Sequence, residues 1–87
     1  MSKKHILFLC TGNYYRSRYA EEFFNHLAAR SALDWEATSR ALAIERLKKN
    51  VGPIAPAAVA ALIADKISPV AATRMPLPCT YGDLTTA

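Results

Sequence analysis

Hydrophobic and polar positions near the N-terminus predict a strand, a short loop and a helix. Residues 6–9 are bulky, branched and uncharged, which is typical of a strand buried on both faces. Residues 16–30 then carry apolar side chains at helical spacing, and we expect their apolar stripe to pack on a sheet. The stripe contains Tyr19, Phe23 and Leu27, with Ala20 and Phe24 beside it.

A second strand is predicted for residues 34–39, where Trp35, Ala37 and Ser39 alternate with polar residues. A strand, a helix and a strand of these lengths fit a parallel βαβ unit. The sequence therefore predicts an α/β fold.

The rest of the chain predicts shorter elements. Residues 41–49 are compatible with a short helix, and residues 56–66 with an alanine-rich helix that begins at a proline. Residues 68–78 contain three prolines and no clear period, which predicts a loop. Thr80 and Asp83 have the spacing of a capping box, which predicts a further helix.

The loop between the first strand and the first helix carries the candidate chemistry. Gly12 and Asn13 are the residue types that most readily adopt a positive φ, so the chain can curl just after Cys10. A curled loop at a helix N-terminus directs several backbone N–H groups at an anion such as phosphate, and Arg16 can add a planar, bidentate fork.

The same positive field favours a thiolate. Helix N-termini and neighbouring cations lower a cysteine pKa from about 8.5 to roughly 3.5–7.5. Cys10 beneath a bound phosphoryl group is then a nucleophile aimed at phosphorus. Ser17 is placed to donate a hydrogen bond to the sulfur, which would ease its departure in a second step.

The segment Cys10-Thr11-Gly12-Asn13-Tyr14-Tyr15-Arg16-Ser17, followed by Ala20-Glu21, resembles the active-site loop of the low-molecular-weight protein tyrosine phosphatases. That family includes thioredoxin-coupled arsenate reductases. The resemblance implies a three-layer α/β fold with a parallel sheet. It also implies that Cys10 is the nucleophile, that Asn13 braces the loop and that Ser17 assists the departing thiolate. Phosphate would be held by Arg16 and the loop amides, with substrate contacts from Thr11, Gly12, Asn13, Tyr14 and Tyr15.

Three positions depart from the family pattern. Tyr15 stands where many relatives have a second cysteine, Arg18 where a proline is usual, and Ala71 where some relatives have a histidine that supports the loop. We expect Arg18 to be a solvated surface residue. Tyr14 is expected to line the pocket mouth, where its ring can stack on a phenyl group. Ser39 matches the serine that, in the family, closes the second strand near the loop.

In the family, an aspartate that precedes a proline late in the chain supplies the proton for the leaving oxygen. None of Asp34, Asp65 and Asp83 precedes a proline, so we assign no general acid. We interpret Asp83 as a residue of a helix first turn. The resemblance covers only about the N-terminal half of a family member. We therefore expect residues 1–87 to form a single, incomplete domain of two strands and flanking helices, with the sheet completed by a second chain or segment.

These residues predict hydrolysis of phosphate monoesters, either protein phosphotyrosine or small aryl phosphates, through a cysteinyl-phosphate intermediate. Because no general acid is assigned, a second interpretation stays open: a module that binds phosphate or a phosphorylated partner without turnover. Arsenate reduction is a third interpretation. It must pass a disulfide through further cysteines, and Cys79 is the only other cysteine in the sequence.

Composition and charge argue against several other classes. The net charge of +4 is mild, and Lys3-Lys4 and Lys48-Lys49 are short solvated pairs rather than a stripe that binds nucleic acid. The longest apolar run, residues 53–64, contains two prolines and falls short of the ~20 residues that span a bilayer. The apolar stretch after Lys3-Lys4 is too short for a secretory signal. We expect a cytoplasmic protein with two free thiols, no nucleic-acid or membrane partner, no metal and no cofactor.

Overall fold

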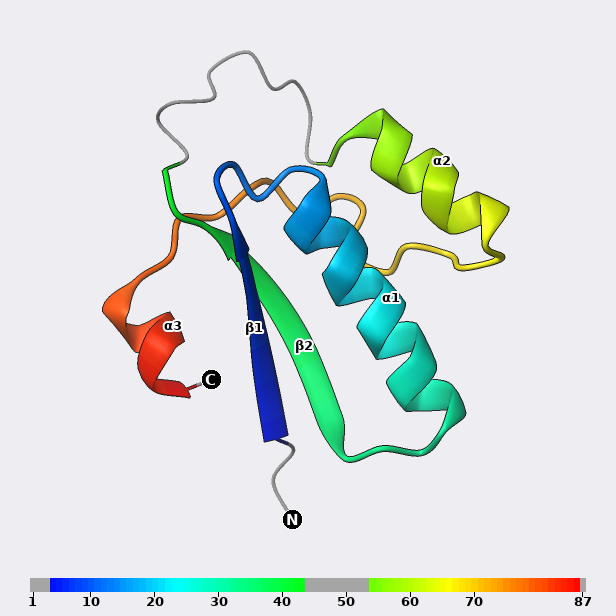
Figure 1. The fold of residues 1–87 in the computed structure, drawn as a ribbon, viewed down its shortest axis with the longest axis horizontal. Coiled ribbons are helices and arrows are strands. Elements are labelled where there is room, and N and C mark those ends of the chain that lie inside the picture. Colours follow the sequence, from blue (N-terminus) through cyan, green and yellow to red (C-terminus); the bar gives the residue numbers. More distant parts are fainter. Residues whose placement is uncertain (1–3, 44–53, 87) are drawn as a thin grey trace.

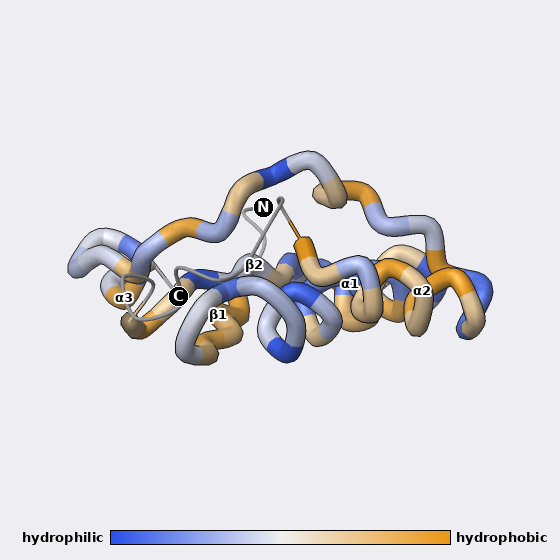
Figure 2. Tube along the Cα trace, turned by 90° about the horizontal axis from the view of Figure 1, so that it is seen from above, coloured by the Kyte–Doolittle hydropathy of each residue, from blue (hydrophilic) through white to orange (hydrophobic). Residues whose placement is uncertain are grey.

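The computed structural model describes residues 4–43 and 54–86. Its elements in chain order are β1 (Lys4–Cys10), α1 (Arg16–Arg30), β2 (Trp35–Ala41), α2 (Pro56–Ala64) and α3 (Tyr81–Thr86) (Figure 1). The molecule is flat, with principal extents of 38 × 34 × 16 Å. Seen from above, α2 and α3 lie at opposite ends of the long axis, with the strands between them (Figure 2).

The two strands pair in parallel, with a register that runs from Lys4 opposite Trp35 to Cys10 opposite Ala41. The α1 helix connects them and packs against β2, which confirms the parallel α/β unit predicted from the sequence (Figure 1). The predicted alternation in β2 is correct for Ala37 and Ser39 but wrong for Trp35, which is 36% exposed at the start of the strand. Ala37, Ser39 and Ala41 are buried, whereas Glu36 is exposed, because the odd-numbered positions face the helix.

The expectation that β1 is buried on both faces is wrong in this structure. Its residues 6–8 are only half-buried, and Leu9 is 38% exposed. The reason is that β1 pairs with β2 along one edge, while the described residues place no strand along the other. On the α1 side, the rings of Phe8 and Phe24 meet edge to face, with their centroids 6.3 Å apart.

The α1 helix spans the predicted residues, but the face that it buries is not the predicted one. Leu27, at the end of the apolar stripe, is 46% exposed. The Tyr19 ring stacks on Phe23, and its hydroxyl donates to Asp65 Oδ2 over 2.7 Å, so this part of the stripe lies near the end of α2. The buried positions of α1 are Ser17, Arg18, Glu21, Glu22 and Ala28. Polar side chains are buried there because they bond to the loop and to the segment after α2.

The α2 helix begins at Pro56, as predicted, and ends at Ala64, two residues early. Ala58 and Leu62 are fully buried, and Ala58 forms a small core with Ile54 and Ala55. The predicted helix over residues 41–49 is wrong at its start, because Ala41 ends β2 and residues 42–43 are not helical. The remainder of that helix lies outside the described residues.

The segment after α2 returns along the outer edge of β2. The N–H of Ala41 donates to Leu77 O over 2.7 Å, and its carbonyl accepts from Cys79 N over 2.8 Å. A single parallel bridge joins Ala41 to Pro78. Residues 68–78 otherwise contain no helix or strand, as predicted.

The predicted capping box at the start of α3 is confirmed. Thr80 N donates to Asp83 Oδ2 over 2.8 Å, and Asp83 N donates to Thr80 Oγ1 over 3.2 Å. Asp83 also pairs with Arg40 Nε at 3.3 Å. Because side chains alternate along a strand, Arg40 points away from the face that α1 covers. The α3 helix therefore contacts the sheet from the side opposite α1. None of the described helices is long and apolar enough to cross a bilayer.

Candidate active-site loop

The loop lies where β1 ends and α1 begins (Figure 1). Asn13 has a φ of 51°, which confirms the predicted left-handed turn. Gly12 beside it is buried. No side chain caps the first turn of α1, and the N-terminal end of a helix favours an anion.

The Cys10 sulfur is surrounded by hydrogen-bonding groups. Its Sγ lies 3.0 Å from Ser17 Oγ. Burial alone would raise the pKa of the thiol, but hydrogen bonds from the Ser17 hydroxyl and from the backbone N–H groups of Ser17, Asn13 and Tyr14 outweigh it. The pKa of Cys10 is therefore lower than its ordinary value. These donors approach the sulfur from both the loop and the first turn of α1, which is the arrangement that a thiolate needs.

Asn13 connects the loop to the rest of the fold. Its Nδ2 donates to Ser17 Oγ over 2.9 Å and to Ser39 Oγ over 2.8 Å, and its Oδ1 accepts from Leu77 N over 3.0 Å. The side chain is fully buried. The oxygen of Ser17 accepts from this amide, so its hydroxyl proton can still be donated to a thiolate at Cys10.

A charged pair, Glu21 and Arg74, lies behind the side-chain amide of Asn13. Ser39 Oγ donates to Glu21 Oε1 over 2.6 Å, and Arg74 Nη1 pairs with the same oxygen at 3.1 Å. Arg74 Nη2 donates to Ser39 Oγ over 3.0 Å and to Asn13 Oδ1 over 3.3 Å. Glu21 is 5% exposed. Four polar side chains thus bond to one another behind the loop: Asn13 of the loop, Glu21 of α1, Ser39 of β2 and Arg74 of the 68–78 segment.

The remaining predicted site residues line the outer side of the loop. Arg16, the first residue of α1, is exposed, and Tyr15 is 41% exposed. Thr11 O accepts from Ala43 N over 2.9 Å, and Tyr14 O accepts from Ala55 N over 2.9 Å. Tyr14 also packs on the small core at the start of α2, so α2 holds one side of the loop.

Arg18 is not the solvated surface residue that we expected. It is fully buried, and its Nη2 donates to Ala71 O over 2.7 Å. Sequence reasoning also missed the role of Glu22, which is 4% exposed and accepts from the backbone of Val70 and Ala71. A usable signal was present, because Arg18 and Glu22 are one helical turn apart and lie on the same side of α1 as Ser17 and Glu21.

The three aspartates already have structural surroundings. Asp83 belongs to the capping box, and the hydrogen bond from the Thr80 backbone, with help from Arg40, lowers its pKa. Asp65 ends α2 and accepts from Tyr19, while Asp34 lies exposed before β2.

The two cysteines lie on different sides of β2. Cys10 pairs with Ala41 from the β1 side, and Cys79 bonds to Ala41 from the outer edge. They are therefore separated by two strand spacings of ~4.8 Å each, more than the ~7 Å between Cα atoms that a disulfide tolerates. Both are free thiols. Among the described residues, no three His, Cys, Asp or Glu side chains form a group that could hold a metal.

The structure places a Cys-x5-Arg loop between the strand and the helix of a parallel βαβ unit. Comparison with known proteins identifies the family. A family model described as "Low molecular weight phosphotyrosine protein phosphatase" matches residues 5–74. The chain therefore belongs to the low molecular weight phosphotyrosine protein phosphatase family.

Solved structures agree with this assignment. A low molecular weight protein tyrosine phosphatase from T. tengcongensis is 29% identical with a TM-score of 0.82, over 98% of this chain and 54% of that chain. A mutant of YwlE from Bacillus subtilis is 28% identical with a TM-score of 0.78, over 98% and 53%. A low molecular weight protein tyrosine phosphatase from Bacillus subtilis, solved in solution, is 30% identical with a TM-score of 0.74, over 95% and 51%.

The chain thus spans about half the length of the solved relatives that it matches. No curated protein matches it.

Proposed function

We propose that this chain carries the catalytic loop for hydrolysis of phosphate monoesters, with protein phosphotyrosine or small aryl phosphates as substrates. Family membership supports the reaction class. The observation that carries the proposal is the environment of Cys10, whose sulfur lies 3.0 Å from Ser17 Oγ and receives hydrogen bonds from three backbone N–H groups. The lowered pKa of Cys10 increases the fraction of the side chain that is present as the thiolate nucleophile.

In the first step of the proposed reaction, the Cys10 thiolate attacks phosphorus and forms an Sγ–P bond. The bond from phosphorus to the ester oxygen breaks, and the leaving oxygen takes its electron pair. Arg16 and the loop amides bind the equatorial oxygens, where charge is spread in the transition state. Because Arg16 is exposed at the start of α1, its guanidinium can swing over a bound phosphoryl group.

In the second step, a water molecule attacks phosphorus and the Sγ–P bond breaks. Inorganic phosphate and the Cys10 thiolate are released, and the water gives up a proton to solvent. The Ser17 hydroxyl donates a hydrogen bond to the departing sulfur and keeps its proton, while its oxygen accepts a hydrogen bond from Asn13. A poor leaving group is thereby stabilised where negative charge develops.

The leaving oxygen also needs a proton, and a positioned acid typically contributes 10²–10⁴-fold. We assign no such acid among Asp34, Asp65 and Asp83. An activated aryl phosphate depends least on this proton, because its phenolate is already a good leaving group. We therefore propose that small aryl phosphates are the substrates on which the loop of this chain can be tested first.

The test is a burst assay with p-nitrophenyl phosphate on the 87-residue chain, with Cys10→Ser and Arg16→Ala as comparison variants. We expect a rapid phase that releases one equivalent of p-nitrophenol per active site, followed by slow turnover. Loss of the burst in both variants would support the proposed nucleophile and phosphate ligand. A burst that survives in Cys10→Ser would contradict the mechanism.

The absence of an assigned acid favours one alternative, a module that binds phosphate or a phosphorylated partner without turnover. Calorimetry with inorganic phosphate separates the two. Binding without a burst supports the module, whereas binding with a burst supports the hydrolase. Arsenate reduction gains no support, because the placement of Cys79 across β2 from Cys10 does not suit direct disulfide formation.

Two further expectations remain proposals. We propose that residues 1–87 act as one domain, with a second chain or segment that pairs along the open edge of β1. The greater length of the solved relatives supports this. We also propose a cytoplasmic location, where reducing conditions would keep both thiols free.

A further inference from the structure

Two buried, oppositely charged residues of α1 hold the backbone of the segment that carries Arg74. We propose that Arg18 and Glu22 are positioning residues, which act through Arg74 and Asn13 to fix the geometry of the Cys10 loop. This inference deepens the proposed function and rests on it for the role of the loop. Its contacts and its test concern Cys10 directly.

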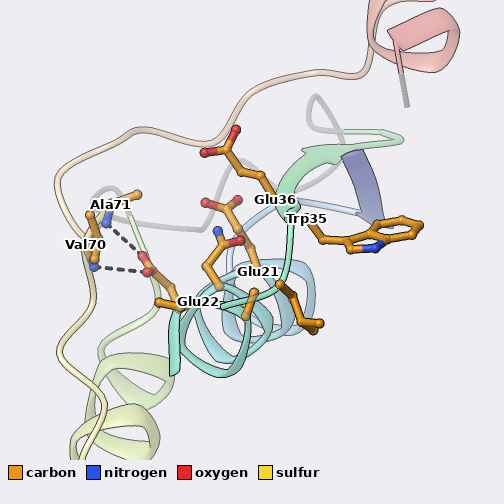
Figure 3. A pocket seen from close by; sticks show the side chains of 10 residues that line it. Glu21, Glu22, Trp35, Glu36, Val70 and Ala71 are labelled. Atoms are coloured by element: carbon orange, nitrogen blue, oxygen red, sulfur yellow. Dashed lines mark hydrogen bonds between the residues drawn. The ribbon is translucent and has the colours of Figure 1, made fainter. Parts of the chain in front are cut away.

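Glu22 uses both carboxylate oxygens on the backbone. Its Oε1 accepts from Val70 N over 3.0 Å, and its Oε2 accepts from Ala71 N over 2.8 Å (Figure 3). The side chain is 4% exposed, so these charge-assisted bonds are shielded from water. A carboxylate that fills both oxygens with consecutive amides fixes the position of that peptide.

Arg18 holds the same residue from its other side. Its Nη2 donates to Ala71 O over 2.7 Å, and the side chain is fully buried. The N–H and the carbonyl of Ala71 are thus both bonded to α1. Because Arg18 and Glu22 are one turn apart on the same face of the helix, both side chains can bond to the backbone of a single residue.

The bonds that hold Ala71 also position Arg74. Ala71 O also accepts from the backbone N–H of Arg74 over 3.1 Å, which closes a tight turn between the two residues. The guanidinium of Arg74 then bonds to Asn13 Oδ1 and Ser39 Oγ. A shift of the turn would move Arg74 and, with it, the amide that orients Ser17.

The charges of this region balance one another. Burial lowers the pKa of Arg18 and the nearby charge of Arg74 adds to this, while Glu21 and Glu22 act in the opposite direction. Two guanidinium groups therefore share a largely buried region with two carboxylates. Removing one member leaves a buried charge without its balance, so the effect is expected to reach the loop.

The test uses the full chain with Cys79→Ser, so that alkylation by iodoacetamide reports Cys10 alone. Arg18→Met removes the side-chain donor to Ala71 O, and Glu22→Gln removes the carboxylate that accepts from Val70 N and Ala71 N. Arg18→Lys restores a donor at position 18. Arg30→Met is the control, at an exposed position of the same helix. Each variant is first checked by circular dichroism and thermal unfolding. The alkylation rate is then measured as a function of pH, together with the affinity for inorganic phosphate.

We expect Arg18→Met and Glu22→Gln to weaken phosphate binding about tenfold, because a misplacement of ~1 Å can cost 10²-fold. The pH midpoint of alkylation should move upward in both, return towards the starting value in Arg18→Lys and stay unchanged in Arg30→Met. If either folded variant is less stable but keeps the midpoint and the phosphate affinity, the inference is overturned and the contacts are only structural. Should Arg18→Met not fold, Glu22→Gln decides.

The proposed function can fail separately. A starting chain that shows no burst, yet whose midpoint shifts in the two variants, would refute hydrolysis and support the positioning role. A burst that is unaffected by both variants would support hydrolysis and refute the positioning role.

Discussion

Asn13 Nδ2 donates to Ser17 Oγ over 2.9 Å, and the same oxygen lies 3.0 Å from Cys10 Sγ. The Ser17 hydroxyl therefore connects the side-chain amide of Asn13 to the cysteine sulfur. Because this amide holds the serine that lowers the pKa of Cys10, we expect substitutions at Ser17, at Asn13 and at the Glu21–Arg74 pair behind them to have separable effects.

The first prediction concerns Ser17. In Ser17→Ala, the sulfur loses the side-chain hydrogen bond that lowers its pKa, while the backbone N–H groups remain. The pKa of Cys10 should rise, so at a pH near the midpoint of the unsubstituted protein the thiolate fraction should fall and alkylation should slow. At alkaline pH, where the thiol is ionised in both proteins, the rates should converge. Ser17→Thr keeps the hydroxyl and should retain the low midpoint; equal profiles for all three proteins would contradict the role of Ser17.

The second prediction concerns Asn13, which combines buried bonds with a positive φ. Asn13→Ala removes the side-chain hydrogen bonds to Ser39, Leu77 and Arg74, and we expect a loss of about 2–4 kcal/mol in the free energy of unfolding in urea. Asn13→Gly loses the same bonds but relieves the left-handed backbone. It should be the more stable of the two by about 1 kcal/mol. The reverse order would show that the loop conformation does not limit stability.

The third prediction concerns the pair of Glu21 and Arg74, with 3.1 Å between Oε1 and Nη1. Removing one partner leaves the other charge partly buried, so Glu21→Gln and Arg74→Met should each destabilise by about 2 kcal/mol. The double variant should cost less than the sum, with a coupling energy of about 1–2 kcal/mol. Urea unfolding at low and high salt measures this coupling. Additive effects would mean that the two side chains act on the loop independently.

The fourth prediction concerns the packing of α2 and has a control one residue away. Leu62 is fully buried, whereas Ile63 is 61% exposed. Leu62→Ala should destabilise the chain by about 2–4 kcal/mol through lost burial and a cavity. Ile63→Ala, with a side chain of the same size removed, should cost well under half as much. Comparable losses would indicate that Ile63 is covered in solution.

The sequence was sufficient where structure depends on near neighbours. The bounds of α1, the alternation in β2 and the capping box of α3 follow from local spacing, and all three are observed. The loop was recognised for the same reason, because Cys10 and Ser17 are seven residues apart. Their roles in a reaction stay predictions.

The sequence was insufficient where burial depends on distant segments. Arg18 is buried by Ala71, which is 53 residues further along the chain, and no local pattern indicates this contact. The buried face of α1 was predicted wrongly for the same reason. Its residues Glu21 and Glu22 accept hydrogen bonds from residues 68–78, which are distant in the sequence. It is notable that Arg18 and Ala71, two departures from the family pattern, are in contact with each other.

The bond from Leu77 N to Asn13 Oδ1 joins residues 64 positions apart. Chains are synthesised from the N-terminus and begin to fold during synthesis, so a nascent chain on the ribosome can form β1 and α1 long before residue 77 leaves the exit tunnel. Until then, the side-chain oxygen of Asn13 lacks its bonds from Arg74 and Leu77, and the amide is held only by Ser17 and Ser39. During early translation, the loop around Cys10 would therefore form with part of its support, and the rest would be added only when the chain is long enough to close behind it.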